Sequence, residues 1–303
     1  MFKEQYKHQV DLLIRCLPFV EKQECFAIKG GTAINLFIQN MPRLSVDIDL
    51  TYLPLKNRDE SLKEIGAALL KIKKGIEKFI PNSHVTVNSI SNIPGKLIVL
   101  WNDVQIKIEV NFVLRGSVYD AEPMEICKEV QNLFQQFAKV RILSKEDLYA
   151  GKICAALDRQ HPRDLFDVML LLNEGDISLG TRKAFVVYLA GHSRPMHELL
   201  NPKLKDLKNV FESQFDGMTR ESVFLNDLYA TREKLIDTVH NSLTPSEKQF
   251  LISIKKADPD WDVLGLKHIK NLPSLQWKLI NIRKMTIKKR RETIRKLEKV
   301  LNL

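Results

Sequence analysis

The stretch 29–50 constrains the fold most, because its hydrophobic pattern changes period partway along it. Gly30 and Gly31 permit a turn that side chains would block, and Thr32 is suited to cap the helix that follows. Apolar residues in that helix recur at the spacing of one helical face. After Pro42 the period falls to two, which predicts a strand. This part of the chain is therefore expected to fold as a turn, a helix and a strand in succession.

Two aspartates occupy one face of the predicted strand. Asp47 and Asp49 alternate with three apolar residues, so the two carboxylates project from the same side. Like charges this close raise each other's pKa or need a cation. Magnesium suits such a place, because it takes one or two carboxylates and fills its other positions with water and substrate phosphate. The backbone N–H groups of the glycine turn are suited to phosphate oxygens. The alternative is a surface strand with two solvated aspartates.

A later strand carries a third carboxylate. In the segment 104–112 apolar residues alternate with polar ones, and Glu109 lies on the polar face. Glu109 is therefore free to share a site with Asp47 and Asp49, as a metal ligand or as the acceptor of a proton. The alternative is a half-exposed strand with one glutamate. The other elements expected in this half are helices over 1–25 and 60–79 and strands over 26–29, 84–90 and 96–102.

From Ser144 onward the chain is expected to be almost wholly helical. Ser144 and Asp147 resemble a capping box, with Asp147 in the place usually held by Glu. The helix that begins there runs to about residue 160. Pro162 suits the first position of the next helix, since a missing N–H costs nothing there.

Charged residues gather on both sides of this helix break. Lys152 and Arg159 share one face of the first helix. Asp164 and Asp167 follow Arg163 and, three apart, face together away from the apolar stripe of the second helix. The alternative is a pair of solvated helix faces with favourable charge pairs.

The net charge of +10 and the pI near 9.3 favour a polyanionic partner. Most of the excess lies in residues 278–299, which hold ten Lys or Arg and two Glu. Helical spacing predicts a basic C-terminal helix over 277–301, which is a solvated face or an RNA contact. The opening residues are broken by charges, and no apolar run reaches the length of a membrane span. We therefore expect a cytoplasmic protein with no membrane partner.

The two motifs are similar to those of one family. The GGTA turn, followed by Arg43-x-Ser45-x-Asp47-x-Asp49, resembles the first motif of the AbiEii/AbiGii-type (MenT-like) nucleotidyltransferases, toxins of the polymerase-beta-like nucleotidyltransferase superfamily. The superfamily pattern has Gly-Ser where this chain has Gly31-Thr32, which keeps a hydroxyl. The segment 107–111 resembles the third-carboxylate motif, and the charged residues at 152–167 resemble a second signature of the family. Three later segments, 194–202, 215–219 and 273–279, are also similar to family blocks.

The resemblance implies an α+β protein with a nucleotidyltransferase domain over 1–143, built on a mixed sheet with flanking helices, and a helical domain over 144–303. It implies transfer of a nucleoside monophosphate from a nucleoside triphosphate, with Mg²⁺ or Mn²⁺, to an RNA such as the 3′ end of tRNA. It also implies a toxin of a toxin–antitoxin or abortive-infection system and a cognate antitoxin as partner. There are two alternatives. The protein could modify a protein or small molecule by the same chemistry, or it could be a non-catalytic protein of this fold that binds nucleic acid or a partner.

The resemblance also assigns roles to individual residues. The metal ligands would be Asp47, Asp49 and Glu109. The catalytic residues would be these three together with Lys152, Asp164 and Asp167. The nucleotide-binding residues would be Lys29, Gly30, Gly31, Thr32, Arg43, Ser45, Lys152, Arg159 and Arg163. The candidate RNA-binding residues are Lys288, Lys289, Arg290 and Arg291.

Overall fold

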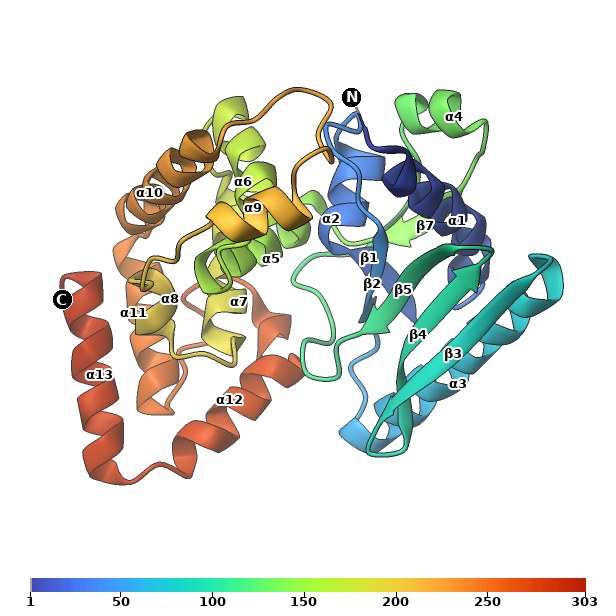
Figure 1. Ribbon diagram of the computed structural model, residues 1–303. Coiled ribbons are helices and arrows are strands. Elements are labelled where there is room, and N and C mark those ends of the chain that lie inside the picture. The colour runs from blue at the N-terminus through green and yellow to red at the C-terminus, as the bar shows by residue number, and fades with distance from the viewer. Residues whose placement is uncertain (1) are drawn as a thin grey trace. The chain divides into compact units, whose positions relative to one another are not determined.

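The structure, a computed structural model, describes residues 2–303 and divides the chain into two compact units (Figure 1). The first unit contains the chain up to Leu148 together with Phe215–Val223. The second contains Tyr149–Gln214 and Phe224–Leu303. The domain boundary expected at residue 143 lies five residues before the point at which the units divide, and a short later segment returns to the first unit.

The first unit is built on a mixed sheet, which has seven strands in the described residues, in the order β3-β4-β5-β2-β1-β7-β6. Strand β2 is central: it pairs antiparallel with β1 and parallel with β5. The strands are β1 Phe26–Lys29, β2 Asp47–Tyr52, β3 Ser83–Ile90, β4 Ile93–Trp101, β5 Val104–Val110, β6 Glu122–Glu125 and β7 Lys139–Ile142. The strands expected over 26–29, 84–90, 96–102 and 104–112 are confirmed, whereas the sequence patterns do not predict β6 and β7.

Helices cover one face of this sheet. Helix α1 contacts β5 and β7, helix α3 contacts β3 and β4, and the two helices contact each other. Ile48 and Leu50 of β2 and Ile108 of β5 are fully buried, as period two requires for the face turned toward a core. The helices of this unit are α1 Glu4–Glu21, α2 Gly30–Ala33, the π-helical turn η1 Ile34–Ile38, α3 Arg58–Phe79 and α4 Lys128–Phe134.

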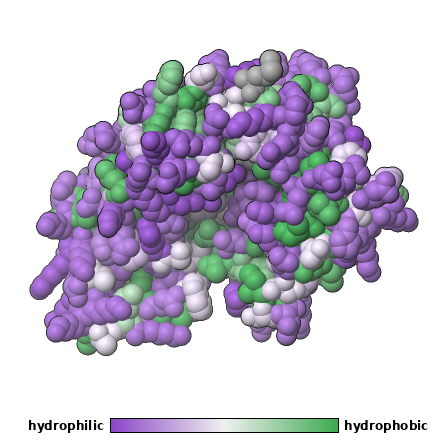
Figure 2. Space-filling view, in the orientation of Figure 1, coloured by the Kyte–Doolittle hydropathy of each residue, from purple (hydrophilic) through white to green (hydrophobic). Residues whose placement is uncertain are grey.

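The second unit is all helical in the described residues. It comprises most of α5 Lys145–Asp158, then α6 Pro162–Glu174, α7 Leu179–Gly191, α8 Met196–Leu200, α9 Lys208–Gln214, α10 Leu225–Ser242, α11 Pro245–Lys256, the 3₁₀ turn η2 Lys267–Asn271, α12 Pro273–Arg283 and α13 Ile287–Leu301. The single basic helix expected over 277–301 is wrong, because the chain breaks after Arg283 and Thr286 caps a new helix through its side chain. Hydrophilic residues dominate the face of the molecule drawn in Figure 2, with scattered apolar patches. No helix in residues 2–303 is long and apolar enough to span a membrane.

Candidate functional site

The glycine turn joins β1 directly to the short helix α2. Gly30 has φ +73°, a left-handed conformation that glycine adopts without steric cost. A Cβ placed on Gly30 would lie 2.7 Å from Oδ2 of Asp49. The turn therefore needs glycine both for its backbone conformation and for its close approach to the second aspartate.

Thr32 does not cap the helix, so that prediction is wrong. Helix α2 begins at Gly30 and places Thr32 inside its first turn, fully buried. The Thr32 hydroxyl donates a hydrogen bond to the backbone oxygen of Asp47 and lies 3.1 Å from Oγ of Ser45. Thr32 thus ties the glycine turn to the start of β2, where the first aspartate sits.

Arg43 and Ser45 lie directly against Gly31. A Cβ on Gly31 would be 2.5 Å from Nη2 of Arg43 and 2.9 Å from Oγ of Ser45. Arg43 is buried, and its Nη1 donates to the backbone oxygen of Leu44 at 2.9 Å. Both side chains therefore support the turn from within the unit, and their direct contact with nucleotide stays a prediction.

The carboxylates belong to a row of charges that crosses the sheet. Asp49 of β2 is in register with Lys29 of β1 on one side and with Glu109 of β5 on the other. Glu109 is in turn opposite Lys96 of β4, whose Nζ lies 2.8 Å from Oε2 of Glu109. Residues in register share a face of the sheet, so the predicted neighbourhood of Asp49 and Glu109 is confirmed. Asp47, two residues before Asp49, is half-buried on the same face.

This face suits a cation that is shared with substrate phosphate. Among the residues that the structure describes, no three His, Cys, Asp or Glu side chains converge to hold a metal ion by themselves. Mg²⁺ is usually held by only one or two carboxylates, with water and phosphate oxygens completing the shell. Asp47 and Asp49, beside the glycine turn, supply that number. Glu109 is engaged by Lys96, and its role as a third metal ligand stays a prediction.

In the second unit, Lys152 is buried between two aspartates. Its Nζ lies 2.9 Å from Oδ1 of Asp164 and 2.9 Å from Oδ2 of Asp167, and all three side chains are at most 5% exposed. Helix α5 supplies the lysine and α6 both aspartates, three residues apart on one face. The alternative of solvated helix faces is therefore wrong for these residues.

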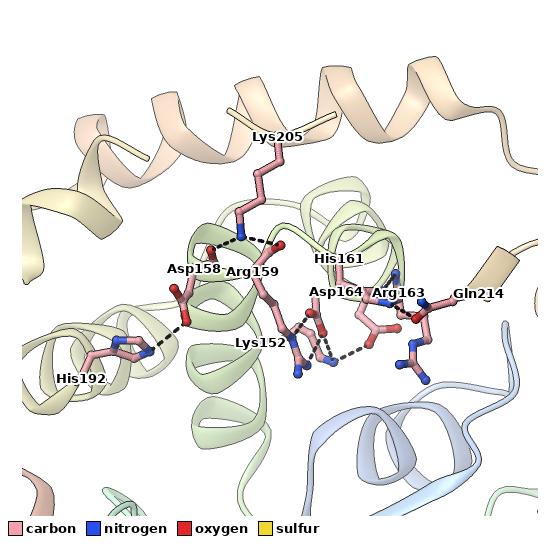
Figure 3. A network of polar contacts seen from close by, with 10 residues as sticks. Lys152, Asp158, Arg159, His161, Arg163, Asp164, His192, Lys205 and Gln214 are labelled. Carbon is pink, nitrogen blue, oxygen red and sulfur yellow. Dashed lines mark hydrogen bonds and ion pairs between the residues drawn. The ribbon is translucent and has the colours of Figure 1, made fainter. Parts of the chain in front are cut away.

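Arg159 completes the pair of cations around Asp164. Its Nε and Nη2 lie 2.5 and 3.0 Å from the two carboxylate oxygens of Asp164, in the two-pronged geometry that guanidinium favours (Figure 3). Burial alone would raise the pKa of Asp164, but the charges of Lys152 and Arg159 outweigh it and hold that pKa well below its ordinary value. Asp164 is therefore ionised at neutral pH. Unlike Lys152, the Arg159 side chain is 63% exposed and accessible to a ligand.

His161 sets the start of α6, a role that no pattern in the sequence predicts. Its Nδ1 accepts a hydrogen bond from the backbone N–H of Arg163, and its Nε2 lies 3.2 Å from Oε1 of Gln214. Burial is the main cause that lowers the pKa of His161, which favours the neutral ring. A neutral ring accepts at Nδ1 and donates at Nε2, as both contacts require. His161 therefore caps the helix that carries both aspartates, followed by Pro162 at its predicted first position.

The family follows from comparison with known proteins. The model of the nucleotidyl transferase AbiEii toxin, of type IV toxin–antitoxin systems, matches residues 11–280. The chain belongs to the AbiEii family. Among solved structures, MenT4, a nucleotidyltransferase toxin from Mycobacterium tuberculosis H37Rv, is similar with a TM-score of 0.60 and 14% identity, over 92% of this chain and 93% of that chain. That likeness shows a shared fold. Comparison with curated proteins found no match.

Both groups of charges lie inside the AbiEii match, and further polar contacts hold the second group in place. The amide of Gln160, which follows α5, donates to the backbone oxygen of Lys203 and accepts from the backbone N–H of Lys205. Nζ of Lys205 in turn donates to the backbone oxygens of Asp158, the last residue of α5, and of Arg159, which follows it, as a cation does at a helix C-terminus (Figure 3). These contacts fix the helix end that presents Arg159. No spacing in the sequence signals them.

In this AbiEii protein Ser144 caps the start of α5, and Asp147 in its first turn binds a distant loop. Oγ of Ser144 accepts from the backbone N–H of Asp147 at 3.0 Å, which confirms the predicted N-cap. The buried carboxylate of Asp147 accepts from the backbone N–H groups of Val118 and Tyr119, at 2.9 and 2.8 Å. A shorter Asp in the place of Glu therefore also anchors a distant loop to the helix.

Proposed function

We propose that this AbiEii protein is a metal-dependent nucleotidyltransferase that moves a nucleoside monophosphate from a triphosphate to the 3′ end of an RNA, with tRNA as the acceptor. The observation that carries the proposal is the contact between the glycine turn and the aspartate strand: Gly30 packs against Asp49 so closely that no side chain fits between them. Phosphate oxygens and a carboxylate-bound cation would therefore meet at one place. Because nucleoside triphosphates and tRNA are found in the cytoplasm, we place the reaction there.

The site residues of the first unit have separate roles in this proposal. Asp47 and Asp49 would hold Mg²⁺, which supplies neutralisation of the charge that develops on the phosphates. The Gly30–Gly31 backbone would hold the triphosphate. The acceptor hydroxyl attacks the α-phosphorus in line, a new phosphodiester bond forms, and the bond to the leaving pyrophosphate breaks.

The attacking hydroxyl must also lose its proton, and we propose that Glu109 accepts this proton. Glu109 stands next to Asp49 on the same face of the sheet, within the row of charges. The ammonium of Lys96 pairs with Glu109 at 2.8 Å and orients it. Lys96→Met should therefore lower the rate of transfer without preventing nucleotide binding.

The charged residues of the second unit divide into two kinds. Arg159, exposed and planar, and Arg163 are suited to contact phosphate oxygens directly. Lys152, enclosed by Asp164 and Asp167, is suited to hold those carboxylates in place. Lys152 could then bind phosphate only if its ion pair with Asp164 or Asp167 broke.

Helix α13 is our candidate for the acceptor-RNA contact. Lys288, Lys289 and Arg291 are exposed on its first turns, whereas Nη2 of Arg290 lies 3.4 Å from the backbone oxygen of Arg283. Three of the four residues in the predicted run are therefore available to phosphates.

The direct test incubates the purified protein with each labelled nucleoside triphosphate, Mg²⁺ and total cellular RNA. We expect label on one RNA class with one nucleotide, and loss of labelling in Asp49→Asn. The matched control is Asp103→Asn, which removes an exposed carboxylate of the same unit from the β4–β5 turn. Labelling of a protein or a small molecule, with RNA unlabelled, would replace RNA as the acceptor. No transfer with any triphosphate would refute the proposed activity.

The type IV toxin–antitoxin family also predicts a growth phenotype and an antitoxin partner. We propose that overexpression stops growth and that co-expression of the cognate antitoxin restores it. Normal growth of a host with abundant wild-type protein would refute toxicity. The same host carrying Asp49→Asn is the control for general effects of overexpression.

A further inference from the structure

Two lysines and a histidine in the second unit form a group that is offset by few acidic side chains. Its members lie on α8, α11 and α12; α11 contacts α12, and α13 contacts both α8 and α11 (Figure 1). The segments 194–202 and 273–279, which resemble family blocks without an evident role, supply two of them. The group is Lys255, Lys278 and His197.

Lys255 is the most deeply buried of the three. It lies near the end of α11 with 2% of its surface exposed, and within residues 2–303 its ammonium makes no hydrogen bond or ion pair. Burial lowers the pKa of Lys255, because a charge away from water is poorly solvated. Lysine is almost never fully buried unless it is paired. This position therefore lacks the partner that burial calls for.

Lys278 lies close enough to Lys255 for their charges to repel. Its Nζ donates to the backbone oxygens of His192 and Arg194, at 2.6 and 2.9 Å. Burial first, and then the charge of Lys255, lower the pKa of Lys278 to about 8. An ammonium has three donors, and these two carbonyls use two of them. One donor of Lys278 remains for a further acceptor.

His197 faces the same cations. Its Nδ1 is buried and has no hydrogen-bond partner among the described residues. Burial lowers the pKa of His197; Glu198 opposes this, and the charges of Lys255, Lys296 and Lys278 lower the pKa further. The ring therefore has an unused polar atom in a positive environment.

The nearby acids are already occupied or exposed. Glu292 pairs with Lys296 at 2.7 Å, and Asp158 pairs with Arg194 at 3.1 Å. Glu198 is the acid that offsets the charge of Lys278, and it is exposed to solvent. The charge of half-buried Lys278 is thus offset by one exposed carboxylate, and buried Lys255 has no ion-pair partner among the described residues.

We propose that Lys255, Lys278 and His197 form a binding site for a phosphate group. A dianionic or monoanionic phosphate would supply the missing charge, accept from both ammonium groups, and accept from Nδ1 of His197 in its protonated or δ-tautomeric form. The phosphate belongs either to a phosphodiester of an RNA or to a free phosphate. This site does not depend on the proposed transferase activity, because binding is measured without turnover.

The test measures binding and thermal unfolding at constant ionic strength, with inorganic phosphate in one arm and a short single-stranded RNA without terminal phosphates in the other. Chloride is the reference anion. At ten times its Kd, a ligand that binds only the native protein should raise the Tm by about 3 to 6 °C. Lys255→Met should weaken binding at least about tenfold, because it removes a charge-assisted hydrogen bond. Lys256→Met, at the exposed neighbour on α11, should bind as wild type does.

Lys255→Met carries a second signature. It replaces an unpaired buried cation by an apolar chain of similar length, so it should raise the Tm without phosphate while reducing the further rise with phosphate to at most about 2 °C. Lys278→Gln is the second variant, and it should also weaken binding. A response to inorganic phosphate identifies a free phosphate, and a response to RNA alone identifies phosphodiesters. If neither ligand raises the Tm above chloride, or if both variants respond as wild type does, the site is refuted.

Discussion

Removing Lys152 should destabilise the second unit strongly. In Lys152→Ala, Asp167 would lose its ammonium partner while still buried, and Asp164 would keep only Arg159. Breaking a buried ion pair by deleting one partner costs about 3 to 5 kcal/mol, since an uncompensated charge remains. At about 2 to 4 °C per kcal/mol for a unit of this size, the Tm should fall by roughly 6 to 20 °C.

The pH dependence of the free energy of unfolding has a defined sign. The folded pKa of Asp164 is lowered, so its carboxylate contributes stability that is present above the unfolded pKa, about 3.9. This stability is lost as the pH falls toward the folded pKa. Lys152 is the largest cause of the lowering, and its removal should raise the folded pKa of Asp164. Acid unfolding of Lys152→Ala should therefore begin at a higher pH than in wild type.

A double variant that removes one charge of each sign tests whether the unpaired buried charge causes the loss of stability. Lys152→Met with Asp167→Leu removes one charge of each sign and leaves Asp164 paired with Arg159, so it should regain most of the stability that Lys152→Ala loses. Urea unfolding in a Trp101→Phe background is a suitable assay, because the fluorescence then comes from Trp261 and Trp277 of the second unit. A Lys152→Ala variant within about 0.5 kcal/mol of wild type would refute the buried position of this lysine.

Three further predictions concern the glycine turn, Arg159 and helix α13. Gly30→Ala should abolish transfer and cost about 1 kcal/mol or more, because its φ is +73° and its Cβ would displace the carboxylate of Asp49; a fully active variant would contradict this. Arg159→Ala should raise the KM for the triphosphate while stability changes by at most about 1 kcal/mol, because the side chain is mostly exposed. Replacing residues 288–291 by glutamine should reduce the slope of log K for RNA binding against log salt concentration by up to about 0.7 for each phosphate that the helix no longer binds. An unchanged slope would indicate that these residues serve solubility or antitoxin binding instead.

Periodicity predicted most elements of the first unit, though not β6, α4 or β7, and one further contact was within reach of the sequence. The strands 96–102 and 104–112 are separated by a very short turn, and Asn102 there adopts φ +49°, as Asn does in two-residue hairpins. With Trp101 opposite Val104, the register places Lys96 opposite Glu109. Counting back from the turn would therefore have found the ion pair. The parallel register of β2 with β5 has no such local signal, because their pairing depends on the whole sheet.

The wrong prediction for Thr32 has a physical cause. Hydroxyl residues are favoured at N-caps, so the motif by itself predicts a glycine turn followed by a cap. The chain enters the helix at Gly30 itself, and the hydroxyl donates to the backbone oxygen of Asp47 at the start of β2. Local propensity identified the right residue types but could not reveal a partner fifteen positions away. Asp147 is similar, since its contacts with Val118 and Tyr119 depend on tertiary structure.

Burial also separates the two cations of the second motif. A Lys and an Arg on one helix face look equivalent in the sequence, which predicts that both hold phosphate. In the structure Lys152 is 5% exposed and Arg159 is 63% exposed, although both contact Asp164. A phosphate can approach the exposed guanidinium from solvent, but it could reach the buried ammonium only in competition with two carboxylates. Loss of activity in Lys152→Ala alone would therefore not demonstrate phosphate binding, and Arg159 is the residue whose removal tests it.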